Sequence, residues 1–295
     1  MFDLRYHVAS LAAVFIALII GILVGVGISG KGFVSDSERK VLNLQISDLR
    51  ASRDSANRRA SELAKSQRAA QSFVADAYPA LMAGRLAGTR VALAFVGPME
   101  GRVRGQVERT LDDAGADPPL RVRALKLPID LAALRRSLKG HPALAGLATK
   151  EGIDELGKRL GEDFVAGGDS APWRLLSPEL VEEQSGNSAP PADGVVVART
   201  VPAQSGLTAR FLAGFYAGLG AGGVPAVGVE PTRTSDSTIE AFARQDLSTV
   251  DDLDSEAGRL SLALLLGGGP PGNYGVKKTA RDGVLPAIPS TAAGG

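Results

Sequence analysis

The sequence predicts an α/β protein in three parts: a single N-terminal transmembrane helix, a coiled-coil stalk, and a Rossmann-like domain with a mainly parallel sheet and helices on both faces. Three observations predict this class. Residues 8–28 are apolar and uncharged, residues 38–78 lack glycine and show heptad spacing, and short apolar runs alternate with helical patterns after residue 90. The predicted boundaries are 1–30 for the anchor, 31–80 for the stalk, 86–286 for the domain and 287–295 for a disordered tail.

The stretch from Val8 to Ile28 predicts a membrane anchor. It reaches the roughly 20 apolar residues that a helix needs to cross a ~30 Å hydrocarbon core. Its Val, Leu, Ile and Phe residues favour insertion by about −4 to −8 kcal/mol. A cleaved secretory signal is the alternative, but its apolar stretch is shorter, about 7–15 residues, and follows a positive n-region. We therefore expect an uncleaved helix in the lipid bilayer.

Charge alone does not orient this anchor. Arg5 precedes the helix, whereas Lys31, Arg39 and Lys40 follow it, which by the positive-inside rule favours a cytoplasmic C-terminal side. Long domains, however, translocate largely regardless of charge. The residues leave both orientations open.

Small residues recur every four positions along the anchor and share one helix face: Ala9, Ala13, Ala17, Gly21, Gly25 and Ser29. Such spacing lets the backbones of two membrane helices approach closely. Ala and Gly are also common in membrane helices without a specific role. Six in register favour a self-association face, with Ala13, Ala17, Gly21 and Gly25 as the helix-packing residues.

Heptad spacing from Glu38 to Tyr78 predicts a coiled coil of about 40 residues, or roughly 60 Å. One core position holds Leu42, Leu49, Ala56, Leu63, Ala70 and Ala77, and the other holds Ile46, Arg53, Ala60, Gln67 and Val74. The seam is imperfect because Arg53 and Gln67 interrupt it. A lone amphipathic helix packed on the domain is the alternative. The best seam residues are Leu42, Ile46, Leu49, Ala56, Ala60, Leu63 and Val74, and Pro79 is expected to end the helix.

The remainder alternates strands and helices. Strands are predicted at 90–96, 122–127, 194–198 and 225–229, and helices at about 98–114, 131–138, 153–164, 207–218, 238–244 and 255–266. Residues 167–193 are interpreted as a long polar excursion beside the sheet. The glycines of 218–223 are interpreted as a helix C-cap and turn.

Residue chemistry gives no support for an enzyme. A net charge of +1 disfavours bulk nucleic-acid binding, and the absence of cysteine removes thiolate sites. The segment 96–102 follows a strand, as a phosphate loop would, but lacks the glycine spacing and the G-K-[ST] ending. Asp251, Asp252, Asp254 and Glu256 do not fit an EF-hand, and we interpret them as acidic residues favoured by a helix dipole. We expect no catalytic, cofactor or metal site.

Three segments resemble the actinobacterial MctB family, which is named for copper transport. They are residues 1–25, Ser248–Ser255 (STVDDLDS) and Gly272–Gly275 (GNYG), and the likeness runs nearly end to end. The resemblance implies an envelope protein with an N-terminal membrane helix, a coiled coil and an extracytoplasmic domain. It implies copper export at an outer membrane, or, for some members, envelope assembly and division with another membrane protein.

The donor residues weigh against direct copper handling. Cu(I) selects Cys and Met, with imidazole second. The chain has no Cys. Its possible donors are Met1, Met82, Met99, His7 and His141, and their spacing matches no metal-binding motif. Our hypothesis is therefore a membrane-anchored envelope scaffold that forms a homodimer and binds another envelope or membrane protein. Copper homeostasis is the alternative, and a nucleotide-binding module is a more distant one.

Overall fold

The computed structural model describes residues 4–29, 36–187 and 189–288. Lys31 and residues 289–295 of the predicted tail lie outside the described residues. The chain divides into two compact units, 1–70 and 71–295.

The first unit contains α1 (Leu4–Ser29) and most of α2 (Asp36–Met82). The large apolar side chains of α1 between Val8 and Ile28 are 53–67% exposed. Its segment His7–Ile28 is the one helix among the described residues that is long and apolar enough to span a membrane. Exposing this much apolar surface to water is unfavourable, so the exposure is consistent with a lipid environment.

Pro79 does not end α2, contrary to the prediction. The helix continues to Met82, and Ala83 N still donates a hydrogen bond to Pro79 O at 3.0 Å. Tyr78 and Met82 are both buried among the residues of the second unit. Packing of this last turn therefore outweighs the hydrogen bond that a helix-internal proline removes.

The second unit is built on a seven-stranded sheet in the order β3-β2-β1-β4-β5-β6-β7. The strands are β1 (Val91–Val96), β2 (Arg121–Leu125), β3 (Val181–Gly186), β4 (Gly194–Arg199), β5 (Ala226–Val229), β6 (Ser248–Val250) and β7 (Asn273–Tyr274). β3 runs antiparallel to β2, and all other neighbouring pairs are parallel. The predicted mainly parallel sheet is confirmed.

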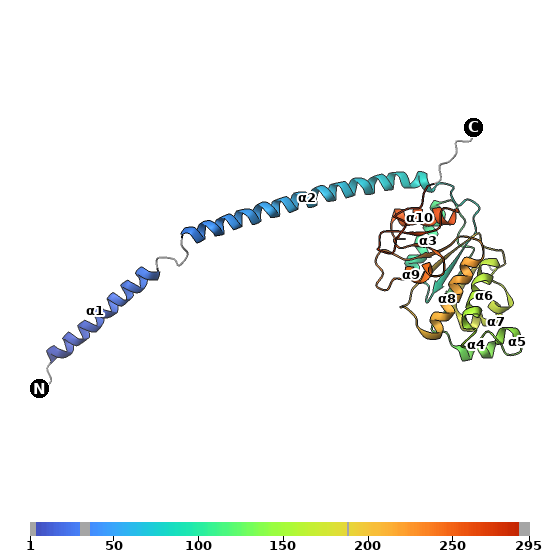
Figure 1. Ribbon diagram of the computed structural model, residues 1–295, viewed down its shortest axis with the longest axis horizontal. Helices are drawn as coiled ribbons and strands as arrows, with labels where there is room; N and C mark the ends of the chain where they lie inside the picture. Colours follow the sequence, from blue (N-terminus) through green and yellow to red (C-terminus); the bar gives the residue numbers. More distant parts are fainter. Residues whose placement is uncertain (1–3, 30–35, 188, 289–295) are drawn as a thin grey trace. The chain divides into compact units, whose positions relative to one another are not determined.

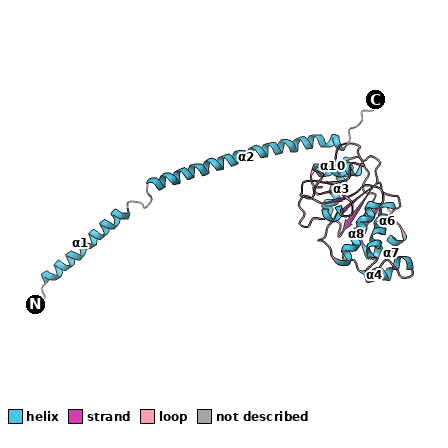
Figure 2. Cartoon of the chain, in the orientation of Figure 1, coloured by secondary structure: helices cyan, strands magenta, loops and turns pink. Residues whose placement is uncertain are grey.

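Helices cover both faces of this sheet (Figures 1 and 2). One face carries α4 (Leu131–Ser137), α5 (Pro142–Ala145), α6 (Ile153–Ala166), α7 (Ala171–Leu180), α8 (Gly206–Ala221) and α9 (Ile239–Ala243). The other carries α3 (Gly101–Asp113), α10 (Glu256–Leu266) and the end of α2. The central strands are buried on both sides, which explains their continuous apolar runs.

The predicted polar excursion of residues 167–193 is wrong in part, because it contains α7 and β3. Ser170 caps α7, and Trp173, Leu176 and Leu180 place an apolar stripe against the core. β3 is an edge strand whose side chains are mostly exposed, so its polar sequence VEEQSG lacked a strand pattern. The short strands β6 and β7 were not predicted.

The predicted helix cap at residues 218–223 is also wrong in part, because α8 continues to Ala221. Gly218 lies inside this helix and packs against α6. A Cβ on Gly214 or Gly218 would overlap backbone atoms of α6, and a Cβ on Gly157 or Gly161 would overlap backbone atoms of α8. Two G-x-x-x-G pairs thus bring α6 and α8 into backbone contact, and the glycines serve packing instead of a turn.

Candidate functional site

The carboxyl ends of β1, β4, β5 and β6 form the edge of the sheet where open α/β proteins bind ligands. Along this edge the chain crosses from one side of β1 to the other, because β2 and β4 flank β1. The loops after β1, β4 and β5 supply its exposed side chains. This geometry makes the carboxyl edge the candidate functional site.

The crevice between β1 and β4 is filled by protein. Thr200 Oγ1 donates a hydrogen bond to Pro98 O at 2.7 Å and so joins the loops that follow the two strands. A Cβ on Gly97, whose φ is +106°, would lie 2.5 Å from Val201 Cγ1 and 2.8 Å from Thr200 Oγ1. The segment 96–102 therefore packs under residues 200–201, in the place where a nucleotide phosphate would approach a phosphate loop.

Two cavities flank this point. One, of about 280 Å³, is lined by Glu100, Arg102, Val103, Ala198–Pro202, Val229, Pro231 and Arg233–Asp236. The other, of about 380 Å³, lies between α8 and α9 and includes Leu212, Tyr216, Glu240, Arg244 and Thr279. Arg199 lines both, and its guanidinium pairs with Asp236 at 3.0 Å.

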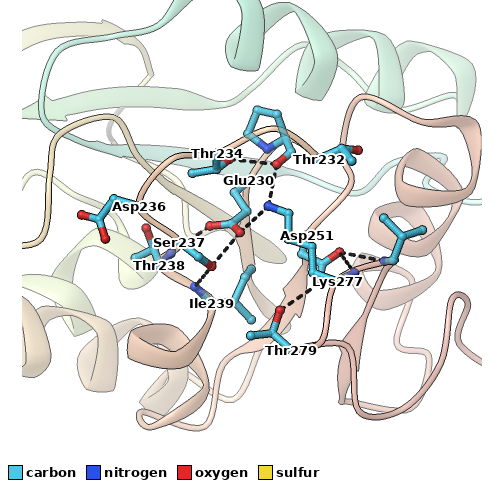
Figure 3. A network of polar contacts seen from close by, with 12 residues as sticks. Glu230, Thr232, Thr234, Asp236, Ser237, Thr238, Ile239, Asp251, Lys277 and Thr279 are labelled. Atoms are coloured by element: carbon cyan, nitrogen blue, oxygen red, sulfur yellow. Dashed lines mark hydrogen bonds and ion pairs between the residues drawn. The ribbon is translucent and has the colours of Figure 1, made fainter. Parts of the chain in front are cut away.

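A buried polar network holds the C-terminal segment of the domain across this edge (Figure 3). Lys277 Nζ donates to Glu230 Oε1 at 2.6 Å and to Pro231 O at 2.8 Å. Ser237 Oγ and Thr238 N donate to the same Glu230 carboxylate. Only 3% of the Glu230 side chain is exposed, so each of these donors offsets the cost of burying its charge.

Asp251 fixes the same segment from β6. It is fully buried, and its carboxylate accepts hydrogen bonds from Val276 N, Lys277 N and Thr279 Oγ1. This corrects the dipole interpretation of the acidic cluster, because Asp251 binds a distant loop. Among the four acids only Glu256 lies in the first turn of α10.

The remaining two acids also have local partners. Asp252 Oδ2 accepts a hydrogen bond from Ser255 Oγ, and Ser255 Oγ in turn caps α10 by accepting from Gly258 N at 2.8 Å. Burial raises the pKa of the Asp252 carboxyl, and the neighbouring carboxylates of Asp251 and Asp254 act in the same direction. Asp254 holds the loop after β5 through Thr232 N and Oγ1. Together these acids build the edge.

The two C-terminal segments that carry the family resemblance lie side by side. β6 and β7 pair in parallel, with Thr249 opposite Asn273 and Val250 opposite Tyr274. Thr249 Oγ1 donates to Asn273 Oδ1 at 2.9 Å. A Cβ on Gly275 would overlap Asp251 Oδ1, so glycine is required for the close approach.

A family model described as "Copper transport outer membrane protein, MctB" matches residues 1–285. The chain belongs to the MctB family. The family name indicates a membrane protein related to copper transport. The long apolar helix α1 is consistent with a membrane protein. No curated protein matches the sequence.

Within the described α/β domain of this MctB family member, the Met and His donor atoms do not converge. Met82 is fully buried and Met99 partly buried on the side of the sheet that carries α3 and α10. Met99 Sδ accepts a hydrogen bond from Arg104. His141 is exposed and precedes α5 on the other face. A Cu(I) site needs such donors on one ion, and these three lie on opposite faces of the sheet.

The anchor and seam residues predicted from the sequence are exposed where the structure describes their side chains. Ala13, Ala17, Gly21 and Gly25 are exposed on α1, and a Cβ on either glycine would meet no atom within 4 Å. On α2, Leu42, Ile46, Leu49, Ala56, Ala60 and Leu63 are exposed, and Val74 is half-buried. Pairing with a second copy stays a prediction.

The polar residues of the carboxyl edge were not predicted from the sequence. Glu230 directly follows the apolar strand β5, and an acid in that position could have been noticed as an edge residue. Arg199 likewise ends β4. Lys277, by contrast, follows no pattern that links it to Glu230.

Proposed function

We propose that this MctB family member is a non-enzymatic, membrane-anchored scaffold of the cell envelope. In this proposal α1 lies in the bilayer, and α1 and α2 pair with a second copy of the chain. The α/β domain lies outside the cytoplasm and binds another envelope or membrane protein during envelope assembly or division. The proposed interaction partners of the chain are the lipid bilayer, a second copy of the chain and another protein.

The observation that carries this proposal is the uncovered apolar surface of α2. Leu49 and Leu63 are each 70% exposed, and Leu42 and Ile46 are 50% and 44% exposed, all at heptad positions. Burying a Leu or Ile side chain fully contributes about 1.5–3 kcal/mol. A parallel partner helix in the same register would cover all four.

The interruptions of this seam are tolerable in a membrane-bound dimer. Arg53 turns its guanidinium to Asp54 at 2.9 Å, and both side chains are at least half exposed. Two anchors that touch in the bilayer raise the effective concentration of the helices that follow them, so a weak seam suffices.

The end of α2 is fixed to the domain, as a scaffold requires. Tyr78 OH donates to Asp113 Oδ2 at 2.8 Å and accepts from Arg259 Nε at 3.2 Å. Burial raises the pKa of this tyrosine to about 12, so its hydroxyl keeps its proton up to a higher pH than an exposed tyrosine would.

Cysteine crosslinking tests the dimer directly, since the chain has no native cysteine. In membranes, Leu49→Cys should form a disulfide-linked dimer under mild oxidation, because paired seam positions meet the distance that a disulfide requires. Ala51→Cys lies on the opposite face of α2 and is the matched control. Equal crosslinking at both positions, or none at either, would rule out the predicted seam.

Topology and partner need separate measurements. A reporter fused after Gly295 should be active outside the cytoplasm, and cytoplasmic activity would reject that half of the proposal. Crosslinking in intact cells, followed by identification of the captured protein, should yield an envelope or membrane protein. Loss of that product in Leu49→Lys, but not in Ala51→Lys, would tie partner binding to the dimer.

Copper homeostasis is the second candidate, and the family description favours it. A direct role would require the domain or a pore to carry the ion. An indirect role requires only that the scaffold support a partner or an intact envelope. Copper sensitivity of a deletion strain alone does not separate them, so the distinction depends on Cu(I) binding by the purified protein.

A further inference from the structure

The 280 Å³ cavity at the carboxyl edge, which we term the edge cavity, has charged residues without a structural role. Arg102 lies in the first turn of α3, and Arg233 lies in the loop after β5. Both side chains are exposed. Within the described part of the chain neither guanidinium makes an ion pair or a side-chain hydrogen bond. Two cations therefore line this cavity with their donors free.

The acidic residues of the cavity do not cancel these charges. Asp236 already pairs with Arg199 and also accepts a hydrogen bond from Ala203 N. That leaves Glu100 as the one unpaired carboxylate in the lining, against two unpaired arginines. The free groups of the edge cavity carry a net positive charge.

The walls of the cavity are held in place before any ligand arrives. Only 7% of the Arg199 side chain is exposed, and it donates to Asp236 O at 2.9 Å in addition to its ion pair. Thr200 joins two loops through Pro98 O, and Thr234 Oγ1 donates to Pro231 O at 2.8 Å. A ligand would meet a formed site at the edge where α/β sheets bind small molecules.

We propose that the edge cavity binds a small oxyanion, a molecule that presents phosphate or carboxylate oxygens to Arg102 and Arg233. The planar guanidinium matches both groups with two parallel hydrogen bonds. The volume, about 280 Å³, lies just below the roughly 300–1,000 Å³ of drug-sized ligand pockets and suits a ligand smaller than a dinucleotide. This site goes beyond the scaffold role and does not depend on it.

Calorimetric titration of the full-length protein in detergent tests the site, with inorganic pyrophosphate and succinate as separate probes at matched ionic strength. At least one probe should bind saturably, one per chain, and the stronger identifies the group. Arg102→Gln and Arg233→Gln should each weaken that binding about tenfold or more, as expected for the loss of a charge-assisted hydrogen bond. Glu100→Gln should tighten it, because it removes a like charge.

Arg109→Gln is the matched control, since Arg109 is an exposed arginine on the same helix outside the cavity. Thermal unfolding of each variant confirms that the fold is retained. If neither probe binds saturably, or if Arg109→Gln weakens binding as much as Arg102→Gln, the proposal is wrong and the arginines only contribute to the surface charge.

Discussion

Lys277 and Glu230, 47 positions apart in the chain, form a 2.6 Å ion pair beneath the loop that follows β5. Lys277 is 20% exposed and Glu230 only 3%. Removing one partner of a buried pair leaves the other charge without compensation, which is why such changes cost about 3–5 kcal/mol. The pair is therefore expected to fix the C-terminal segment to the sheet.

Lys277→Met should lower the free energy of unfolding of the domain by about 3 kcal/mol for that reason. Chemical denaturation followed by the fluorescence of Trp173, the single tryptophan and a fully buried one, measures this directly. Lys278→Met is the matched control, because Lys278 is exposed and makes no ion pair among the described residues. In the double variant with Glu230→Gln the loss should be smaller than the sum of the single losses. Additive losses would show that the pair is not coupled.

The contact between α6 and α8 predicts that alanine is too large at two glycines. A Cβ on Gly157 or Gly161 would overlap the Phe211 or Phe215 carbonyl oxygen of α8. Either glycine-to-alanine change should destabilise the domain by about 1–3 kcal/mol through overpacking, despite the better helix propensity of alanine.

Gly105→Ala is the control for that experiment, because Gly105 lies inside α3 and a Cβ there would meet no atom within 4 Å. It should stabilise the domain by roughly 0.5–1 kcal/mol. A stabilising Gly157→Ala would mean that the two helices separate easily and that the close packing is not required.

The pair of Arg90 and Asp193 predicts a dependence of stability on pH. Two side-chain hydrogen bonds from Arg90, at 2.8 and 2.9 Å, and one from its backbone N lower the pKa of Asp193 to about 2. A carboxyl with a lowered pKa stabilises the fold above its unfolded pKa, near 4, and loses that contribution as the pH falls towards 2. Both side chains are about 40% exposed, so the effect is about 1 kcal/mol or less.

The measurement compares the parent with Asp193→Asn. The difference in their free energies of unfolding should be constant between pH 5 and 7 and should shrink as the pH falls from 4 to 2. A difference that does not change with pH would show that the loss does not come from the charge of the Asp193 carboxylate.

The sequence was sufficient to predict elements whose pattern is local. The apolar runs that become β1, β4 and β5 are buried on both faces, and a strand in that setting leaves a continuous apolar signature. β3 left none, since an edge strand exposes Glu182 and Glu183. Pro79 was misjudged because the packing of Tyr78 and Met82, a tertiary effect, decides where α2 ends.

The candidate site could not be predicted in the same way. Its polar residues come from the ends of separate strands and meet only because parallel strands place their carboxyl ends along one edge. Asp251 looked like a helix-dipole residue, yet its partners are Val276, Lys277 and Thr279, 25 to 28 positions away. Sequence spacing carries no information on such a contact.

The face of α1 that carries small residues predicts that dimerisation of the membrane helix depends on two glycines. Replacing Gly21 and Gly25 by Ile should weaken dimerisation of the full-length protein in detergent about tenfold, because helix backbones can no longer approach closely. Gly27→Ile, on the opposite face of the same helix, should leave association unchanged. Analytical ultracentrifugation measures both. A monomeric parent protein would refute the dimer itself.

Copper binding provides the sharpest test between the scaffold and the direct copper role. Met82 and Met99 lie on one face of the sheet and His141 on the other, so we expect these three residues to form no stoichiometric Cu(I) site when the protein competes with a Cu(I) chelator. The comparison variant combines Met82→Leu, Met99→Leu and His141→Gln, in which Leu conserves the volume of the buried Met82.

In a deletion strain, this triple variant should restore copper tolerance as well as the parent protein does, whereas Leu49→Lys should not. That combination assigns copper sensitivity to a missing dimeric scaffold. Stoichiometric binding by the parent that disappears in the triple variant would instead show that the chain holds the ion itself.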